Sequence, residues 1–196
     1  MHAFRLRAGA LGVVALAGLL AAAPPRFVQV KMETALGTIV LRLDRVAAPV
    51  TTRNFLRYVD ARKYDGIAFY RTVRPGNQSP HRPIEVIQGG LDAPDAAPYP
   101  FGRIPLEPTA RTGLHFDDGT IGIARDKAPN TGGSEFFIAI GATNHILDSE
   151  RSPDRYGYAA FGRVVSGMDV VRKIQRSQAR GQRLTPPVRI LRTSRI

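Results

Sequence analysis

Short strand-like segments, separated by turns rich in glycine and proline, make up most of this 196-residue sequence and constrain its fold more than any other feature. Residues 27–44 alternate apolar and polar side chains on both sides of a turn near 35–37, which predicts a β-hairpin. Further strands are expected at 67–73, 84–88, 120–124, 135–140, 161–165 and 186–196. Such a series of short strands is typical of an all-β barrel or sandwich.

Only two stretches, far apart in the chain, have the apolar spacing of a helix. The first, residues 49–61, begins with a proline, which suits a first helical turn. The second begins near Gly167 and places Met168, Val171 and Ile174 on one side. Because strands and helices do not alternate, a doubly wound parallel sheet is excluded. We therefore expect a mainly β, closed barrel with a helix covering each end.

The first 23 residues have the character of a secretory signal peptide. Arg5 and Arg7 precede an unbroken apolar run that ends at Ala23 with an A-x-A-like sequence. A proline follows directly, which leaves open a cleavage point slightly earlier or retention of the segment as a membrane anchor. A buried N-terminal helix is the alternative, but the segment lacks a polar face. We expect a periplasmic or secreted protein with a signal peptide at 1–23 and a single domain at 24–196.

Arginine dominates the charge of the chain. The net charge is +12, and 24 of the 28 basic residues are arginine. A basic surface can bind nucleic acid or anionic membranes. These arginines are scattered, however, without a run of five or six and without interleaved aromatic residues. A solvated surface is the favoured interpretation, and nucleic-acid binding is not expected.

The common catalytic motifs are absent from the sequence. It has no cysteine, no G-x-S-x-G elbow, no P-loop and no H-E-x-x-H motif, and its four histidines lack the spacing of metal ligands. We expect neither a metal nor a cofactor. Arg71 is the unusual residue that remains, because a charge inside an apolar strand is costly unless it has a function. Strand alternation predicts that Phe69, Arg71 and Val73 share one face, and likewise Glu135 and Phe137.

Four stretches of the chain are distinctive: FYR at 69–71, IQGG at 87–90, PNTGGSEFFI at 129–138 and FGRVVSGMDVVRKI at 161–174. Together, and in this order, they resemble a cyclophilin-type peptidyl-prolyl cis–trans isomerase of the bacterial, exported kind. The similarity extends over most of residues 27–195. It implies an eight-stranded antiparallel barrel capped by two α-helices. It also implies a monomer that isomerises Xaa-Pro bonds in exported, folding polypeptides without a cofactor.

The chemistry of that reaction explains why no nucleophile is needed. A prolyl peptide bond isomerises over a barrier of about 18–20 kcal/mol, because the C–N bond loses resonance as it twists out of plane. In the twisted state the proline nitrogen regains a lone pair. A fixed guanidinium that donates to this nitrogen binds the transition state better than the planar ground state, which is what catalysis requires.

The resemblance assigns the catalytic guanidinium to Arg71. Phe137 resembles the phenylalanine on the floor of the proline pocket, and Gln88 resembles the glutamine that orients the substrate and the arginine. The other substrate-binding positions that the resemblance implies are Val86, Ala124, Arg125, Glu135, Ile146, Leu147 and Tyr158.

Several of these positions depart from the family pattern. Glu85 takes the place of an aromatic residue of the pocket, and Glu135 stands where glutamine is usual. The segment 74–83 lengthens the interval between Arg71 and Gln88 and is expected to rim the site. Milder exchanges occur at Val86 for methionine, Ile146 for an aromatic residue and Tyr158 for histidine.

These departures leave a second class of function open. The chain would then be a catalytically weak or inactive peptide-binding or chaperone module on the same barrel. In that alternative Arg71 is a structural arginine, tied by an ion pair to an ionised Glu135. In both alternatives the partners are proline-containing unfolded or flexible polypeptides.

Overall fold

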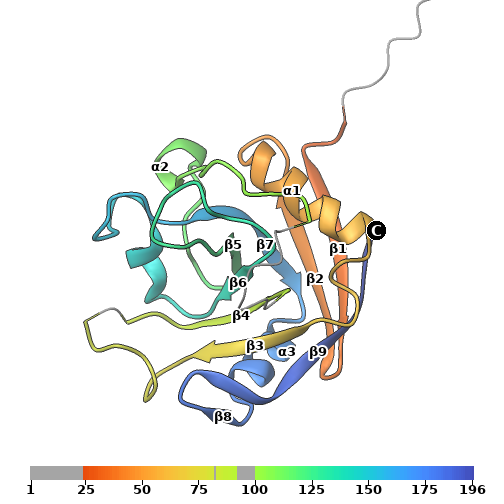
Figure 1. Ribbon diagram of the computed structural model, residues 1–196, viewed down its shortest axis with the longest axis vertical. Coiled ribbons are helices and arrows are strands. Elements are labelled where there is room, and N and C mark those ends of the chain that lie inside the picture. The colour runs from red at the N-terminus through yellow and green to blue at the C-terminus, as the bar shows by residue number, and fades with distance from the viewer. Residues whose placement is uncertain (1–23, 82, 92–99) are drawn as a thin grey trace, which may run out of the picture.

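Within residues 24–81, 83–91 and 100–196, which the computed structural model describes, nine strands form one antiparallel sheet that closes on itself (Figure 1). The expected signal peptide lies outside the described residues. The strands are β1 (Phe27–Thr34), β2 (Gly37–Asp44), β3 (Ala68–Val73), β4 (Val86–Gly90), β5 (Thr120–Ile123), β6 (Phe136–Ala139), β7 (Ala159–Ser166), β8 (Ala179–Arg180) and β9 (Arg183–Arg195). The helices are α1 (Pro49–Asp60), α2 (Thr109–Thr112), the 3₁₀ helix η1 (Asn144–Leu147) and α3 (Met168–Gln175).

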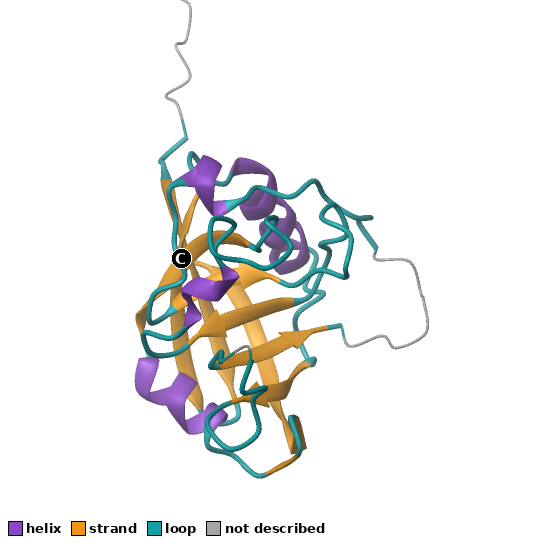
Figure 2. Cartoon of the chain, turned by 90° about the vertical axis from the view of Figure 1, so that its left-hand side faces the viewer, coloured by secondary structure: helices purple, strands orange, loops and turns teal. Residues whose placement is uncertain are grey.

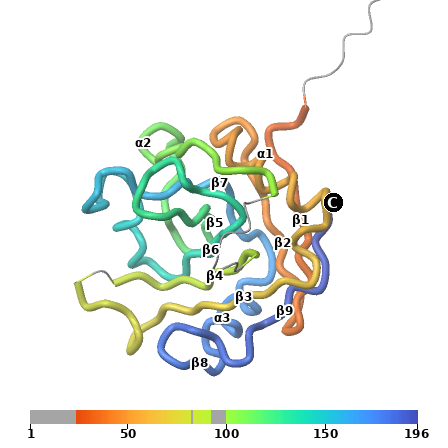
Figure 3. The backbone as a smooth tube through the Cα atoms, in the orientation of Figure 1, coloured from red at the N-terminus to blue at the C-terminus, as the bar shows by residue number. Residues whose placement is uncertain are grey.

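Pairing between the first and last strands closes the barrel. Neighbouring strands follow the order β1-β2-β7-β5-β6-β4-β3-β9, and β1 also pairs with β9, so the described part of the chain forms an eight-stranded ring. The two-residue strand β8 pairs only with β9, outside that ring. Figure 3 shows β1 and β9 side by side. The expected closed, eight-stranded antiparallel barrel is confirmed.

Helices α1 and α3 lie at opposite ends of the barrel, as expected (Figures 1 and 2). The expectation of two helices was incomplete, because α2 and η1 are also present. Each has four residues, which is too short to produce an apolar periodicity in the sequence. None of the helices in the described residues has the length and apolar character needed to cross a membrane.

A distant carboxylate caps the first turn of α1. Pro49 is in the first turn, where a missing N–H has no consequence. The buried Glu107 accepts hydrogen bonds from the backbone N–H of Val50 at 3.1 Å and of Thr51 at 2.7 Å. A negative charge at a helix N-terminus is favourable. Glu107 thereby attaches the long connection between β4 and β5 to one end of the barrel.

The apolar side chains form two separate clusters. The barrel interior is filled by aromatic and aliphatic side chains, among them Phe55, Tyr64 and Phe136. A smaller cluster lies outside this core and consists of Val73, Val86, Phe116, Phe137, Ala139, Leu147 and Ala160. Phe136 and Phe137 are neighbours in β6 but belong to different clusters, because successive side chains of a strand point to opposite faces.

A β-bulge in β3 changes which side chains share a face. The pairing of β3 with both β4 and β9 shifts register between Phe69 and Arg71. Phe69 is fully buried in the barrel core against Phe136, whereas Arg71 and Val73 line a surface cavity. The prediction that Phe69 shares a face with Arg71 was therefore wrong. The extra residue of a bulge breaks the alternation and turns Arg71 outward.

Candidate active site

Cross-strand pairing places the expected catalytic and binding side chains in one row across the sheet. Arg71 on β3 is the partner of Gln88 on β4, and Gln88 is in turn the partner of Phe137 on β6. Neighbouring strands lie about 4.8 Å apart, so two such steps separate the backbones of Arg71 and Phe137 by roughly 10 Å. Both ends of the row are carried by strands, which position side chains more accurately than loops.

Two glutamine side chains hold the guanidinium of Arg71. Its Nη1 donates to Oε1 of Gln88 at 2.8 Å, and its Nε and Nη2 both donate to Oε1 of Gln182 at 2.9 and 2.7 Å. Burial lowers the pKa of Arg71 below its ordinary value, although the nearby phenols of Tyr70 and Tyr158 act in the opposite direction. An arginine starts from so high a pKa that it stays charged in proteins.

A chain of hydrogen bonds continues from Gln88 to Glu135. The Nε2 of Gln88 donates to the hydroxyl of Tyr70 at 2.7 Å, and that hydroxyl donates to Oε2 of Glu135 at 2.5 Å. Ser134 donates to the other carboxylate oxygen at 3.1 Å. The ion pair suggested for Arg71 and Glu135 is not what holds this arginine, because its described hydrogen bonds go to the two glutamines. The described hydrogen bonds connect Glu135 to Arg71 indirectly, through Tyr70 and Gln88.

The ring of Phe137 forms the floor of a hollow beside Arg71. Phe116 stacks beneath it with ring centroids 5.3 Å apart, and Tyr158 meets it edge-on at 5.5 Å. The hollow has a volume of about 130 Å³. A cavity of about 150 Å³ can hold a benzene molecule, so this one is the right size for a single five-membered ring. It is lined by Arg71, Ile84, Val86, Gln88, Ala124, Arg125, Phe137, Leu147 and Tyr158.

A glycine on the neighbouring strand makes room for the floor. Gly122 on β5 is the cross-strand partner of Phe137. A Cβ atom at this position would lie 2.6 Å from Phe116 and 2.8 Å from Phe137. Real Cβ atoms do not come this close to other atoms, so a larger residue would displace one of the rings. Gly122 therefore lets both rings lie against the barrel wall.

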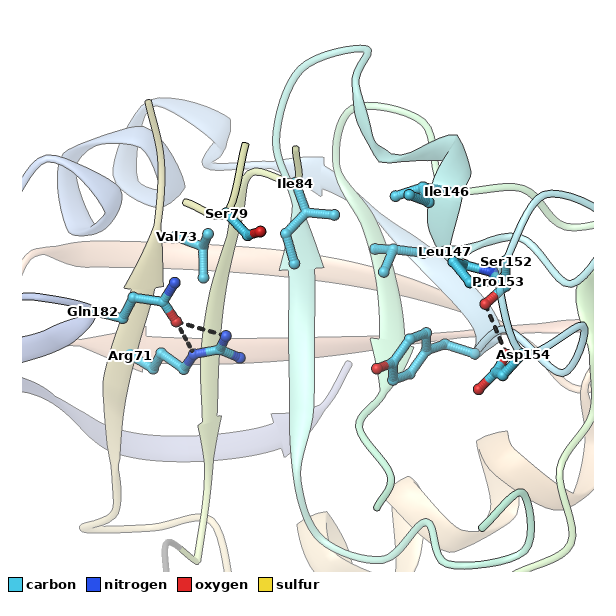
Figure 4. A pocket seen from close by; sticks show the side chains of 11 residues that line it. Arg71, Val73, Ser79, Ile84, Ile146, Leu147, Ser152, Pro153, Asp154 and Gln182 are labelled. Atoms are coloured by element: carbon cyan, nitrogen blue, oxygen red, sulfur yellow. Dashed lines mark hydrogen bonds between the residues drawn. The ribbon is translucent and has the colours of Figure 1, made fainter. Parts of the chain in front are cut away.

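A second cavity of about 250 Å³ adjoins the hollow, and Arg71 borders both. Figure 4 shows Arg71 and Gln182 on one side of it, with Ile146, Leu147 and Asp154 on the opposite side. Ser79, from the segment expected to rim the site, also lines this cavity. The two cavities share Arg71, Ile84, Leu147 and Tyr158 in their linings, so they form one continuous groove beside Arg71.

Comparison with known proteins identifies the family. A family model described as "Cyclophilin type peptidyl-prolyl cis-trans isomerase/CLD" matches residues 29–195. The chain belongs to this cyclophilin family. It is 35% identical over 146 residues to "Peptidyl-prolyl cis-trans isomerase cyp18" of Streptomyces antibioticus, covering 74% of this chain and 82% of that protein. It is 32% identical over 146 residues to "Peptidyl-prolyl cis-trans isomerase B" of Escherichia coli, with coverage of 74% and 83%.

A solved cyclophilin structure has the same fold. The crystal structure of a cyclophilin type peptidyl-prolyl cis-trans isomerase from Cryptosporidium parvum matches with a TM-score of 0.71 at 20% identity. The match covers 87% of this chain and 98% of that one. A structure of the same protein in the presence of the dipeptide Ala-Pro matches with a TM-score of 0.68. At this level of identity the comparison shows that the cyclophilin barrel is shared.

In this cyclophilin, the side chain of Arg125 ties the wall of the hollow to the loop that precedes Tyr158. Its side chain is only 3% exposed. Its Nε donates to the carbonyl of Gly157 at 2.7 Å, Nη2 forms an ion pair with Asp154, and the guanidinium lies 4.8 Å from the ring centroid of Tyr158. These contacts fix the loop that leads into Tyr158. If Arg125 binds substrate as the family resemblance implies, its backbone and not its guanidinium is the group that remains for contact.

The carboxylate of Asp154 is held ionised by its surroundings. Burial alone would raise its pKa, but hydrogen bonds from Arg125, Ser152 and the backbone N–H groups of Tyr156 and Gly157 outweigh burial and lower the pKa well below its ordinary value. The Ser152 hydroxyl donates at 2.8 Å, and the two backbone groups donate at 3.0 and 3.1 Å. Asp154 therefore holds together the loop of residues 152–157, which borders the second cavity, by accepting hydrogen bonds from several of its groups.

Alternation along the segment before β4 puts Ile84, not Glu85, in the hollow. Ile84, Val86 and Gln88 all line it, because alternate residues of an extended segment point to the same side. Glu85 points elsewhere and accepts a hydrogen bond from Nε2 of Gln175 at 3.0 Å, which ties the segment to the end of α3. Glu85 therefore leaves the apolar lining intact, since Ile84 supplies an apolar side chain there.

Ile84, Tyr70 and Gln182 are among the site residues that had not been expected. Counting in steps of two from Gln88 would have identified Ile84. Tyr70 is next to Arg71, but without the bulge it would have been placed on the opposite face. Gln182 lies 111 residues from Arg71, and no local pattern in the sequence connects the two. Among the described residues, no group of three or more histidine, aspartate or glutamate side chains could hold a metal ion.

Proposed function

We propose that this cyclophilin accelerates rotation about Xaa-Pro bonds in polypeptides that fold after export. The observation that carries the proposal is the fixed, partly buried guanidinium of Arg71 beside an apolar hollow of about 130 Å³. The hollow holds the proline ring against Phe137. The rest of the peptide lies along the adjoining cavity, so that one side of the bond is held while the other rotates.

The geometry leaves donors free for the reacting nitrogen. A guanidinium has five N–H groups. Three of the Arg71 groups are occupied by the oxygens of Gln88 and Gln182 among the described residues, which leaves one on each Nη atom. A hydrogen bond from one of these to the pyramidal nitrogen forms only as the bond twists. Hydrogen bonds to charged groups contribute about 1.5–3 kcal/mol, which corresponds to a rate factor of about 10 to 150.

The proposed cellular setting rests on the N-terminal sequence. Arg5 and Arg7, followed by an apolar run and an A-x-A-like end, support export to the periplasm or beyond. Cell fractionation followed by N-terminal sequencing tests this part. Mature protein that begins near Ala23 outside the cytoplasm supports export, and full-length protein in the membrane fraction supports an anchor. Full-length protein in the cytoplasm contradicts both.

The activity itself is tested by exchange NMR on an Ala-Pro-containing peptide. We expect catalytic amounts of the protein to broaden or exchange the cis and trans resonances, which interconvert over tens to hundreds of seconds without a catalyst. The competing proposal is a peptide-binding or chaperone module, motivated by the carboxylate of Glu135 in the hydrogen-bond chain that ends at Arg71. Chemical-shift changes from binding without accelerated exchange would favour that alternative.

A further inference from the structure

Gln182 is joined to the strand that carries Arg71 by both its side chain and its backbone. It lies in the turn between β8 and β9, and its Oε1 accepts two hydrogen bonds from Arg71. Its backbone carbonyl accepts a hydrogen bond from the N–H of Thr72 at 2.8 Å. The acceptor that faces Arg71 is therefore built into the edge of the barrel, next to the bulge that turns Arg71 outward.

The loop after β3 fixes which end of the Gln182 amide faces Arg71. The Nε2 of Gln182 donates to the backbone carbonyl of Asn77 at 3.0 Å. The side chain of Asn77 in turn donates to the carbonyls of Thr72 at 3.2 Å and Gly181 at 2.9 Å. Figure 3 shows this loop beside the β8–β9 turn. A flipped amide would place an oxygen against the Asn77 carbonyl, so only the observed orientation satisfies both neighbours.

The two residues that hold Arg71 are neutral. A carboxylate in either place would also orient the guanidinium, but it would compensate the positive charge. The amide oxygens of Gln88 and Gln182 accept hydrogen bonds from Nε and both Nη atoms of Arg71 without neutralising its positive charge. That charge therefore stays available to stabilise the lone pair that develops on the proline nitrogen. Electrostatic stabilisation of a transition state is most effective when the donor is oriented in advance and needs no reorganisation.

From these contacts we infer that Gln182 is a positioning residue for Arg71. It holds the guanidinium plane so that the unoccupied N–H groups face the hollow, and Asn77, in the turn after β3, takes part by fixing the orientation of the Gln182 amide. This inference rests on the proposed isomerase function. It assigns a role in the reaction to a residue outside the stretches that carry the family resemblance, and to a loop otherwise regarded only as a rim.

The test replaces Gln182 by methionine, which has a similar size but no comparable acceptor. We expect Gln182→Met, in the full chain, to lower kcat by about tenfold, because small misplacements of a catalytic group cost up to about a hundredfold. KM should stay within about twofold, since Gln182 is not proposed to bind the planar substrate. The matched control is Gln178→Met, an exposed glutamine just before β8, which should leave both constants unchanged. A folded Gln182→Met protein with an unchanged kcat, or with only KM raised, overturns the inference.

A second measurement separates this inference from the proposed function and does not depend on the variant folding. Arginine side-chain NMR of the wild-type protein should show slow solvent exchange of the Arg71 Nε–H and hindered rotation about Nε–Cζ. Exchange as fast as that of exposed arginines would overturn the inference. If Arg71 is held but the wild-type protein accelerates no prolyl isomerisation, the proposed function fails while the positioning by Gln182 stands.

Discussion

Arg71 and Gln88 are cross-strand partners on β3 and β4, and their side chains are joined by a hydrogen bond of 2.8 Å. The register of the sheet brings them together, so the contact does not depend on a flexible loop. The next partner in the same row is Phe137, the floor of the hollow. The charged and the apolar parts of the site are therefore positioned by the same three neighbouring strands.

Replacing Tyr70 by phenylalanine should weaken the positioning of Gln88. The variant removes the acceptor of the Gln88 N–H and the donor to Glu135, while Gln182 still holds Arg71. A single neutral hydrogen bond is worth about 0.5–1.5 kcal/mol, so we expect kcat/KM to fall about threefold to tenfold in an isomerase assay. Glu135→Gln is the companion variant. It should lower activity less, and a rise above wild type would show that Glu135 restrains Arg71 after all.

Replacing Gly122 by alanine should push the floor of the hollow outward. The new methyl group would meet Phe116 and Phe137 at less than 3 Å. Overpacking of this kind costs about 1–3 kcal/mol, which thermal unfolding will detect, and the narrowed hollow should raise KM for proline peptides. Gly132→Ala is a useful control because its Cβ would lie 2.8 Å from Ile123 but near neither ring. If both variants raise KM equally, Gly122 has no special relation to the floor.

Asp154 should make the stability of the protein depend on acidity. Because its folded-state pKa is lowered, its contribution is fully present above the ordinary value near 4 and is lost as the pH falls towards the folded-state pKa. We expect Asp154→Asn to have a lower melting temperature than wild type at pH 6. The difference should begin to shrink below about pH 4 and close only in stronger acid. With the side chain 41% exposed, the effect will be modest. A difference that stays constant from pH 6 to pH 2 contradicts this role.

The sequence pattern predicted the closed barrel, whereas the residues of the row came from the family resemblance, and the structure places them on neighbouring strands. Alternation predicted most of the strands, and the spacing of Met168, Val171 and Ile174 predicted the second long helix. Prediction from the sequence failed where a bulge breaks the alternation of a strand, and where two residues in contact lie far apart in the sequence. The bulge in β3 cannot be seen in a sequence that still alternates, so Phe69 was placed with Arg71. The contact of Arg71 with Gln182 depends on closure of the barrel, which no short window contains.

The charge and shape of Arg71 can be separated by two substitutions. Arg71→Ala removes both, and Arg71→Lys keeps the charge but cannot donate to Gln88 and Gln182 through a planar fork. We expect both variants to remain folded, with losses in stability of about 1 kcal/mol, because Arg71 lies on the outer face of the barrel. Lysine should restore little of the activity that alanine loses.

The most direct test of the central proposal is the rate of cis–trans exchange of a proline peptide, measured by NMR with wild-type protein and with Arg71→Ala. We expect wild-type protein to accelerate the exchange and Arg71→Ala to lose about a hundredfold of that acceleration while its melting curve stays cooperative. A folded Arg71→Ala protein that accelerates exchange as well as wild type would contradict the assignment of Arg71 as the catalytic group.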